Sequence, residues 1–508
     1  MRATYRVAPT AHAAANPTDL ASHTMNRRQL IAAGAASLGL AGARRLHALP
    51  VRWDPAVAAD SLAVAADSLA AAAPDSTAAA PTAAPSAEAP AAPSAPVQDR
   101  PAPPARDLRT RWVGERPARV YTPNGSSITG RRAPDGAWVY ELTVGEVEHA
   151  FAPGLTATCW GYNGEVHGPT IEGVEGDRVR IYVTNRLATP TTVHWHGVLL
   201  PSGMDGVGGL SQPVIPPGET FVYEFPLVQH GTLMYHAHHD EMTQIALGLT
   251  GMFVIHPRRE RRPVDRDIAL MLHEWYVEPG TSRPDPNVMS DFNLLTMNGR
   301  AFPGTDPLVV GEGDRVRIRF GNLSPMDHHP VHVHGHAWTI VATDGGAIPE
   351  AGRWPETTVL VPVGATRTVE FVADALGDWA LHCHMTHHVM NQMGHDVPNT
   401  TGVDSQELNR SVQPLVPGYA TMGEAGMDEH GRHIEAGHMA APENSIPMVG
   451  QMGPFGYITM GGMYTNLKVR PKPVSYDADP GWWDHPAGTV ARAASAAELA
   501  RDGVETSS

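Results

Sequence analysis

The chain carries two copies of one pattern, and this duplication limits its possible folds more than any other feature. Residues 176–181 read Gly-Asp-Arg-Val-Arg-Ile, and the same six residues recur at 313–318, an offset of 137. Two His-x-His motifs follow in each copy: 194–196 and 236–238 in the first, 332–334 and 382–384 in the second. The sequence therefore predicts two related domains with histidine pairs at matched positions.

The segments between these motifs have the composition of strands. They are short, rich in β-branched residues and bounded by Gly, Pro and Asn, as at 178–184 and 366–372. Strand signals at this spacing indicate a Greek-key β-sandwich. We therefore expect an all-β fold with domains at 108–257 and 258–470.

A cysteine lies between the histidines of the last motif, His382-Cys383-His384. Neighbouring side chains on a strand point to opposite faces, so Cys383 can face one metal while both histidines face another. A thiolate with imidazoles and a more distant thioether is the ligand set of a blue, electron-transferring copper. The first copy has Ala237 at the equivalent position, so we expect no blue copper in the first domain.

Together the motifs resemble those of the multicopper oxidases, the family that includes laccases. The resemblance implies cupredoxin-like domains and four copper ions. The type 1 copper would take His329, Cys383 and His388, with Met393 as a weak axial ligand; His328 and His387 are adjacent alternatives that the family spacing disfavours. The other implied ligands are His194 and His332 for type 2 copper, and His196, His236, His384, His238, His334 and His382 for the type 3 pair.

The resemblance also implies an activity. Electrons taken one at a time from a reducing substrate would pass from Cys383 through His382 and His384 to the cluster, where O2 is reduced to water. Asp205 matches the acidic residue that assists proton delivery in relatives, although a carboxylate in a turn is usually only a turn former. With only two domains, the chain looks like two-domain laccases, so a homotrimer with clusters between subunits is expected.

The closing strand of each copy indicates an insertion. Residues 251–254 resemble 462–465 at an offset of 211, so the second copy holds about 65 additional residues, at 394–459. Their Gly, Pro and Glu content predicts a loop. This loop would be either a lid over the type 1 copper or a receiver of Cu(I), for which its thioethers and imidazoles are suited. The methionines are Met422, Met427, Met439, Met448 and Met452.

The regions outside the two domains carry other signals. Residues 1–52 contain Arg27-Arg28 before an apolar run too short to span a bilayer, which resembles a twin-arginine export signal at about 25–48. An export signal predicts a periplasmic or extracellular protein. Residues 53–107 are rich in Ala, Pro and Ser and predict a disordered linker. Residues 471–508 form a C-terminal extension.

Charge and motif order narrow the function. The net charge of −16 argues against a nucleic-acid partner. Phenols or aromatic amines and Cu(I) remain competing substrates. Copper nitrite reductases carry their blue-copper cysteine in the first domain and are disfavoured by Ala237, and a simple copper-binding electron carrier would leave eight histidines unexplained.

Overall fold

A computed structural model describes one compact part of the chain. The chain divides into two units, Met1–Val97 and Gln98–Ser508, and every described residue lies in the second. The described residues are 106–278, 280–288, 290, 292–391, 410, 414–415, 443–446 and 450–505. The predicted export signal, nearly all of the predicted linker, Met393 and most of the predicted insertion lie outside them.

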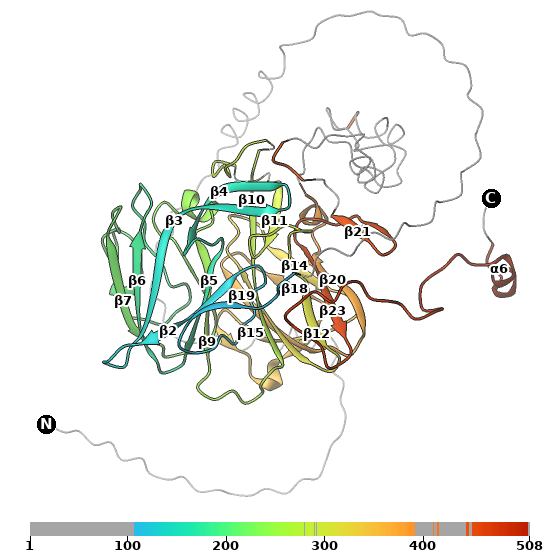
Figure 1. Ribbon diagram of the computed structural model, residues 1–508, viewed down its shortest axis with the longest axis horizontal. Helices are drawn as coiled ribbons and strands as arrows, with labels where there is room; N and C mark the ends of the chain where they lie inside the picture. The colour runs from blue at the N-terminus through green and yellow to red at the C-terminus, as the bar shows by residue number, and fades with distance from the viewer. Residues whose placement is uncertain are drawn as a thin grey trace, which may run out of the picture. The chain divides into compact units, whose positions relative to one another are not determined.

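The first half of the described chain folds into one curled sheet (Figure 1). The strand order is β7-β6-β3-β2-β5-β9-β8, with β1 on β2 and β4 on β3. Its elements are β1 (Arg111–Gly114), β2 (Ser126–Arg132), β3 (Trp138–Ala152), β4 (Leu155–Tyr162), β5 (Gly168–Val174), β6 (Arg178–Asn185), η1 (Ser202–Met204), β7 (Thr220–Pro226), β8 (Gly231–His236), α3 (Glu241–Ala246) and β9 (Thr250–His256).

The second half folds into two sheets and a short hairpin. The sheet orders are β11-β10-β13-β19-β15-β16, with β17 on β15, and β12-β23-β20-β14-β18. Its strands are β10 (Arg266–Trp275), β11 (Leu294–Met297), β12 (Leu308–Gly311), β13 (Arg315–Asn322), β14 (His329–Val333), β15 (Trp338–Thr343), β16 (Gly346–Ala347), β17 (Trp354–Glu356), β18 (Thr358–Val361), β19 (Ala365–Val372), β20 (Gly377–Cys383), β21 (Gln451–Gly453), β22 (Gly456–Ile458) and β23 (Tyr464–Arg470). Its helices are η2 (Glu350–Gly352), η3 (Thr386–Val389) and α6 (Ala496–Asp502).

The duplication in the sequence is also a duplication of strand pairing. The parallel pair β3·β6 corresponds to β10·β13, and the antiparallel pair β6·β7 corresponds to β13·β19. The pairs β8·β9 and β5·β9 correspond in the same way to β20·β23 and β12·β23. The all-β fold of two β-sandwich halves is therefore confirmed.

Strand β6 shows how the repeated sequence forms its strands. Its three aliphatic residues occupy alternate positions and are fully buried, whereas its arginines are not. Arg180 lies opposite Glu224 of β7, and its Nε donates to Oε2 at 2.7 Å. Arg317 of β13 lies opposite Glu370 of β19 and donates to it, also at 2.7 Å. The same cross-strand ion pair thus recurs in both halves.

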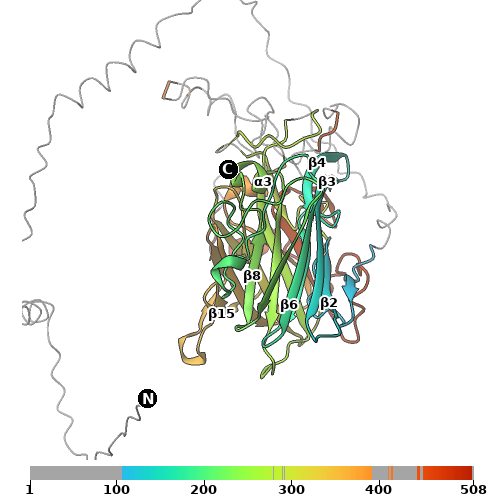
Figure 2. The same cartoon turned by 90° about the vertical axis from the view of Figure 1, so that its left-hand side faces the viewer.

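Strand β8 connects the halves. The hydroxyl of Thr232 accepts from Arg319 of β13 at 2.8 Å and lies 3.0 Å from that of Thr368 in β19. Figure 2 shows β8, β6 and β2 with nearly parallel axes. A small apolar cluster fills the junction, where flexible methionines adapt to both surfaces; its members are Val120, Met234, Met252, Val254, Ala269, Met271 and Leu323.

The described end of the insertion is packed, which the prediction of a loop missed. Ile446 is 5% exposed and belongs to an apolar cluster with Phe151 and Leu155 of the first half. Asn444 accepts from the backbone N–H of Thr156 at 2.8 Å. Strands β21 and β22 then form a hairpin before β23 begins. This end of the insertion is therefore anchored on the edge of the first sandwich.

The C-terminal extension begins by folding back on β23. Lys468 forms an ion pair with Asp479 at 2.6 Å, and its ammonium lies 4.7 Å from the ring centroid of Trp482. The backbone N–H of Trp483 donates to Asp378 at 2.7 Å. Among the described residues, no helix has the length and apolar character needed to cross a membrane.

Candidate metal centres

Three potential metal ligands converge in the second half. Cys383 ends β20, and His329 begins β14, the strand paired with β20 in antiparallel register. The short helix η3 turns the chain back and brings in His388. The Sγ atom of Cys383 lies 3.8 Å from Nδ1 of His329 and 3.5 Å from Nδ1 of His388, and the two Nδ1 atoms are 3.2 Å apart. All three side chains are buried.

The far nitrogen of each imidazole has its own neighbour. Nε2 of His329 lies 2.7 Å from the hydroxyl of Ser324, and Nε2 of His388 lies 3.4 Å from the carboxylate of Asp327. These contacts fix the ring planes so that both Nδ1 atoms face the thiol. Contacts of this kind orient ligands and tune a bound metal.

The chemistry of this set fits a soft or borderline metal ion. Burial raises the pKa of the Cys383 thiol to about 12, and burial lowers the pKa values of both His329 and His388. The imidazoles are therefore neutral near pH 7 and offer lone pairs, whereas the thiol needs a neighbouring cation to ionise. Two imidazoles and one thiolate are the strong ligands of a blue-copper site.

The structure distinguishes the predicted histidines from their neighbours. His328 and His387 are exposed. Nδ1 of His328 accepts from the backbone N–H of Val363 at 3.0 Å instead of approaching the thiol. The structure therefore brings together His329, Cys383 and His388, as the sequence prediction required, while Met393 lies outside the described residues.

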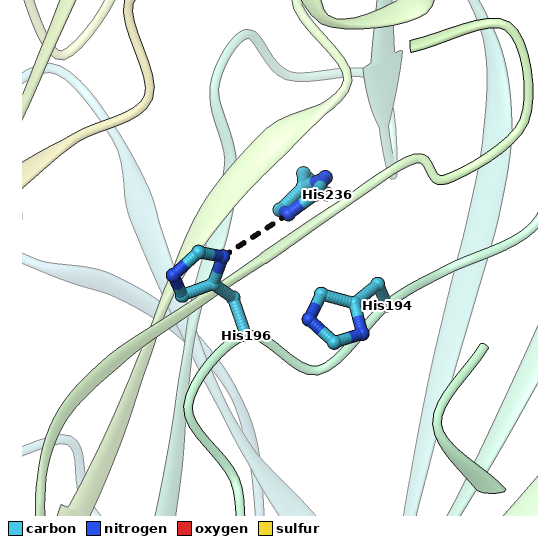
Figure 3. A group of neighbouring side chains, drawn as sticks. All are labelled: His194, His196 and His236. Atoms are coloured by element: carbon cyan, nitrogen blue, oxygen red, sulfur yellow. Dashed lines mark hydrogen bonds between the residues drawn. The ribbon is translucent and has the colours of Figure 1, made fainter. Parts of the chain in front are cut away.

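The predicted histidines of the first half gather at the end of β8, and Figure 3 shows three of them, His194, His196 and His236. Ligand nitrogens of His194, His196 and His236 lie within 4.8 Å of one another. Nδ1 of His196 is 3.2 Å from Nε2 of His236. His238 completes the group, with its ring centroid 5.4 Å from that of His194. This set can hold metal through several imidazoles.

Two acidic residues contact this first set. Nδ1 of His194 lies 2.7 Å from the backbone carbonyl of Asp205 and 3.4 Å from its carboxylate. Glu241, at the start of α3, lies 3.2 Å from Nε2 of His238. Asp205 is thus beside a predicted ligand, and its carbonyl directs the other nitrogen of His194 toward the group.

Two of the four predicted histidines of the second half lie in β14 and β20, namely His332 and His382, and His334 and His384 each follow one of these strands directly. His332 is directly opposite His382 in the ladder. Nε2 of His334 lies 3.2 Å from Nε2 of His382, and the rings of His332 and His384 are 5.5 Å apart. His334 and His384 are exposed. This set forms an open, solvent-facing group.

The two histidine sets are separate within one chain. Every ring contact between predicted cluster ligands joins two members of the same set; among the described side chains, none joins the first set to the second. Each set therefore presents at most half of the predicted eight-histidine cluster. Burial lowers the pKa values of His196, His236 and His382, so these imidazoles are neutral near pH 7 and available as ligands.

Sequence reasoning missed the residues that hold the loop before His329. The buried carboxylate of Glu274 accepts from the backbone N–H groups of Met326 at 2.6 Å and Asp327 at 2.9 Å. Asn322, fully buried, donates to the carbonyl of Asp327 at 2.9 Å and accepts from the N–H of Ser324. Only Asn322 had a usable signal, because it repeats Asn185 at the duplication offset of 137.

Two β-sandwich halves, one of which carries a buried Cys-His-His set, define a copper protein of the cupredoxin type. Comparison with known proteins agrees. Two sequence models of the multicopper oxidase family match this chain, one at residues 143–260 and the other at residues 278–403. Both halves of the described region are thus similar to the multicopper oxidase family, and the donor chemistry of the Cys383 group fits the copper that this family implies.

Individual relatives vary in coverage. "Copper resistance protein A" of Escherichia coli is 26% identical over 396 residues, covering 67% of this chain and 62% of that protein. "Laccase-20" of Oryza sativa subsp. japonica is 31% identical over 258 residues, 46% of this chain and 43% of that protein. The solved structure of "Multicopper Oxidase mgLAC" is 26% identical, with a TM-score of 0.48 and coverage of 66% of this chain and 87% of that one. The chain spans less than two thirds of the length of three curated relatives that are named for copper resistance.

The repeated asparagines give a matched pair of variants. Asn185→Ala and Asn322→Ala each remove three hydrogen bonds at fully buried positions. Each should lower the free energy of unfolding by about 2–4 kcal/mol, because buried backbone groups lose their partners. Only Asn322→Ala should also alter the blue absorption of the copper-loaded protein, since Asn322 holds the loop that precedes His329. Denaturant titration and visible spectroscopy measure the two effects; equal spectra for both variants would contradict the assigned role of Asn322.

Proposed function

We propose that the protein is a multicopper oxidase that takes single electrons from a small reducing substrate and reduces O2 to water. The observation that carries this proposal is the arrangement at the end of β20, where Cys383 faces a buried two-histidine pocket while its neighbours His382 and His384 belong to the open histidine set. When bound, copper would supply one-electron transfer at the first site and O2 reduction at the second. The full complement would be four ions per functional unit.

The residues around Cys383 define the proposed route of the electrons. Cys383 would be the shared ligand, and its peptide bonds join it directly to His382 and His384, so electrons need not cross a gap between side chains. His388 lies beside the half-exposed carboxylate of Asp327, where the type 1 group comes nearest to solvent. A substrate would therefore donate at the edge of the His388 imidazole. Asp205, beside His194, would hold a proton for O2 reduction.

We further propose that the working unit is a homotrimer. The two histidine sets do not meet in one chain, and each is accessible at its own surface. A cluster of eight imidazoles then needs the first half of one subunit against the second half of another, as in two-domain laccases. Closed rings of identical subunits form through such heterologous contacts.

Export through the twin-arginine pathway is part of the proposal. It rests on Arg27-Arg28 and the short apolar run after them. A folded protein would then reach the periplasm or the exterior with its copper sites assembled.

Oxygen consumption tests the oxidase proposal. The copper-loaded protein should consume O2 with 2,6-dimethoxyphenol as donor. His236→Ala should lower this rate by about 100-fold or more, because a ligand of the O2-reducing cluster is lost, while the blue absorption stays. Cys383→Ser should lose both. Wild-type protein that is blue and reduced by the phenol, yet consumes no O2, would indicate an electron carrier instead.

Cu(I) oxidation is the second candidate function, and two exposed methionines favour it. Met326 precedes Asp327, and Met385 follows His384; they are 55% and 40% exposed. Thioethers are suited to Cu(I), and three relatives are named for copper resistance.

Methionine variants separate the two substrates. Met326→Leu/Met385→Leu keeps the volume of both side chains and removes their sulfur atoms. If Cu(I) is the substrate, Cu(I)-driven O2 consumption should fall several-fold while the rate with the phenol is unchanged. The control is Met242→Leu, an equally exposed methionine on α3. Equal Cu(I) rates in wild type, the double variant and the control would favour the laccase-like activity.

Mixed subunits test the trimer. His194→Ala/His196→Ala and His382→Ala/His384→Ala should each be inactive alone. Random mixing would give mixed trimers in about three quarters of cases, each with one intact interface of three, and therefore about a quarter of wild-type activity. Absence of any recovered activity, with light scattering showing a copper-replete monomer, would contradict the proposed assembly.

A further inference from the structure

A large cleft lined with arginines lies away from the predicted copper ligands. Its volume is ≈ 730 Å³, and none of those ligands lines it. The walls come from the first half (Glu175, Gly231), the second half (Arg315, Glu370) and the 257–262 connection between β9 and β10. Eight arginines but only four glutamates line it; the arginines are Arg258, Arg259, Arg261, Arg262, Arg315, Arg317, Arg319 and Arg353.

The floor of the cleft is a satisfied ionic network. Arg317 donates to Glu370 at 2.7 Å and to Asp267 at 3.3 Å, and Arg319 donates twice to Asp267, at 2.6 and 2.8 Å. Arg315 is also paired with Glu370. Arg317 and Arg319 are buried. The buried carboxylates are therefore fully engaged and cannot neutralise further arginines.

The rim carries arginines without acidic partners. The guanidinium groups of Arg258, Arg259 and Arg261 form no ion pair with any described residue, and all three are exposed. Arg353 donates only to the carbonyl of Ile348, at 3.1 Å. Arg262 differs, because it is paired with Glu350. The eight arginines thus outnumber the five carboxylates of the cleft and its floor, which leaves excess positive charge in one concavity of a chain whose net charge is −16.

A glycine makes room for one of these groups. Gly176 has φ +84°, and a Cβ atom there would lie 2.2 Å from Nη2 of Arg258. The backbone N–H of Arg258 contacts the carboxylate of Glu175, at 3.4 Å. The guanidinium of Arg258 therefore lies over the 175–176 turn at the cleft.

We propose that this cleft binds a small multivalent oxyanion, with several phosphate or carboxylate groups. The planar guanidinium group matches both oxyanions with two parallel hydrogen bonds. A volume of this size suits a small organic ligand rather than a single ion. Because the walls come from both halves and their connection, a bound anion would cross-link the halves and stabilise the fold, independently of the oxidase reaction.

Titration calorimetry and thermal unfolding of the copper-loaded full chain test the proposal. The probes are inorganic phosphate, tripolyphosphate and tricarballylate, each compared with sodium chloride at equal ionic strength, with blue absorption monitored to exclude copper extraction. We expect a saturable rise in Tm of about 2 °C or more for at least one multivalent probe. If tripolyphosphate binds more tightly than tricarballylate, phosphate is the preferred group. If tricarballylate binds more tightly, carboxylate is the preferred group.

Variants localise the effect. Arg259→Gln/Arg261→Gln removes two unpaired rim arginines and should weaken binding by at least about ten-fold. The matched control is Arg131→Gln/Arg283→Gln, two exposed arginines outside the cleft, which should bind like wild type. The proposal is overturned if no probe exceeds chloride, or if the cleft variant responds as strongly as the control.

Discussion

The alternation of side chains along β20 is the constraint on which the rest of the site depends. Because neighbours on a strand face opposite sides, Cys383 is turned into the core of the second half while His382 and His384 are turned out of it. The ladder with β14 extends this division, since His329 lies at the buried end and His332 lies opposite His382. One pair of strands therefore sets two metal environments of opposite character within a few bonds of each other.

The buried environment also needs a rigid approach to His329. A loop that ends in a metal ligand holds that ligand in a fixed position only if the polar groups of its backbone have fixed hydrogen-bond partners. Here Glu274 from β10 and Asn322 from β13 bind the backbone of residues 324–327. Both belong to the sheet that does not carry Cys383, so these hydrogen bonds link the two sheets of the second half beside the Cys383, His329 and His388 group.

Much of this arrangement was predictable, because it depends on local periodicity. The repeated Gly-Asp-Arg-Val-Arg-Ile segment and the spaced histidine motifs indicated two β-sandwich halves, and strand alternation alone separated Cys383 from its neighbours. The grouping of His329 and His388 with Cys383 followed from family spacing. The neighbours Glu274, Ser324 and Asp327 were not predictable, since their contacts depend on how distant strands pack, and a single acidic or hydroxyl residue carries no such information.

The insertion at 394–459 shows where prediction from composition fails. Its composition indicates a loop, and a lone isoleucine in such a segment has no periodicity to mark it as buried. Yet Ile446 fills a position beside Phe151 and Leu155, and Asn444 supplies the hydrogen bonds that an irregular backbone needs at the edge of β4. These contacts join a segment of the second half to the first sandwich. The hydrogen bonds of Thr232 in β8 to Arg319 and Thr368 do the same elsewhere. The two halves of one chain are thus fixed to each other by several contacts besides those at the histidine sets.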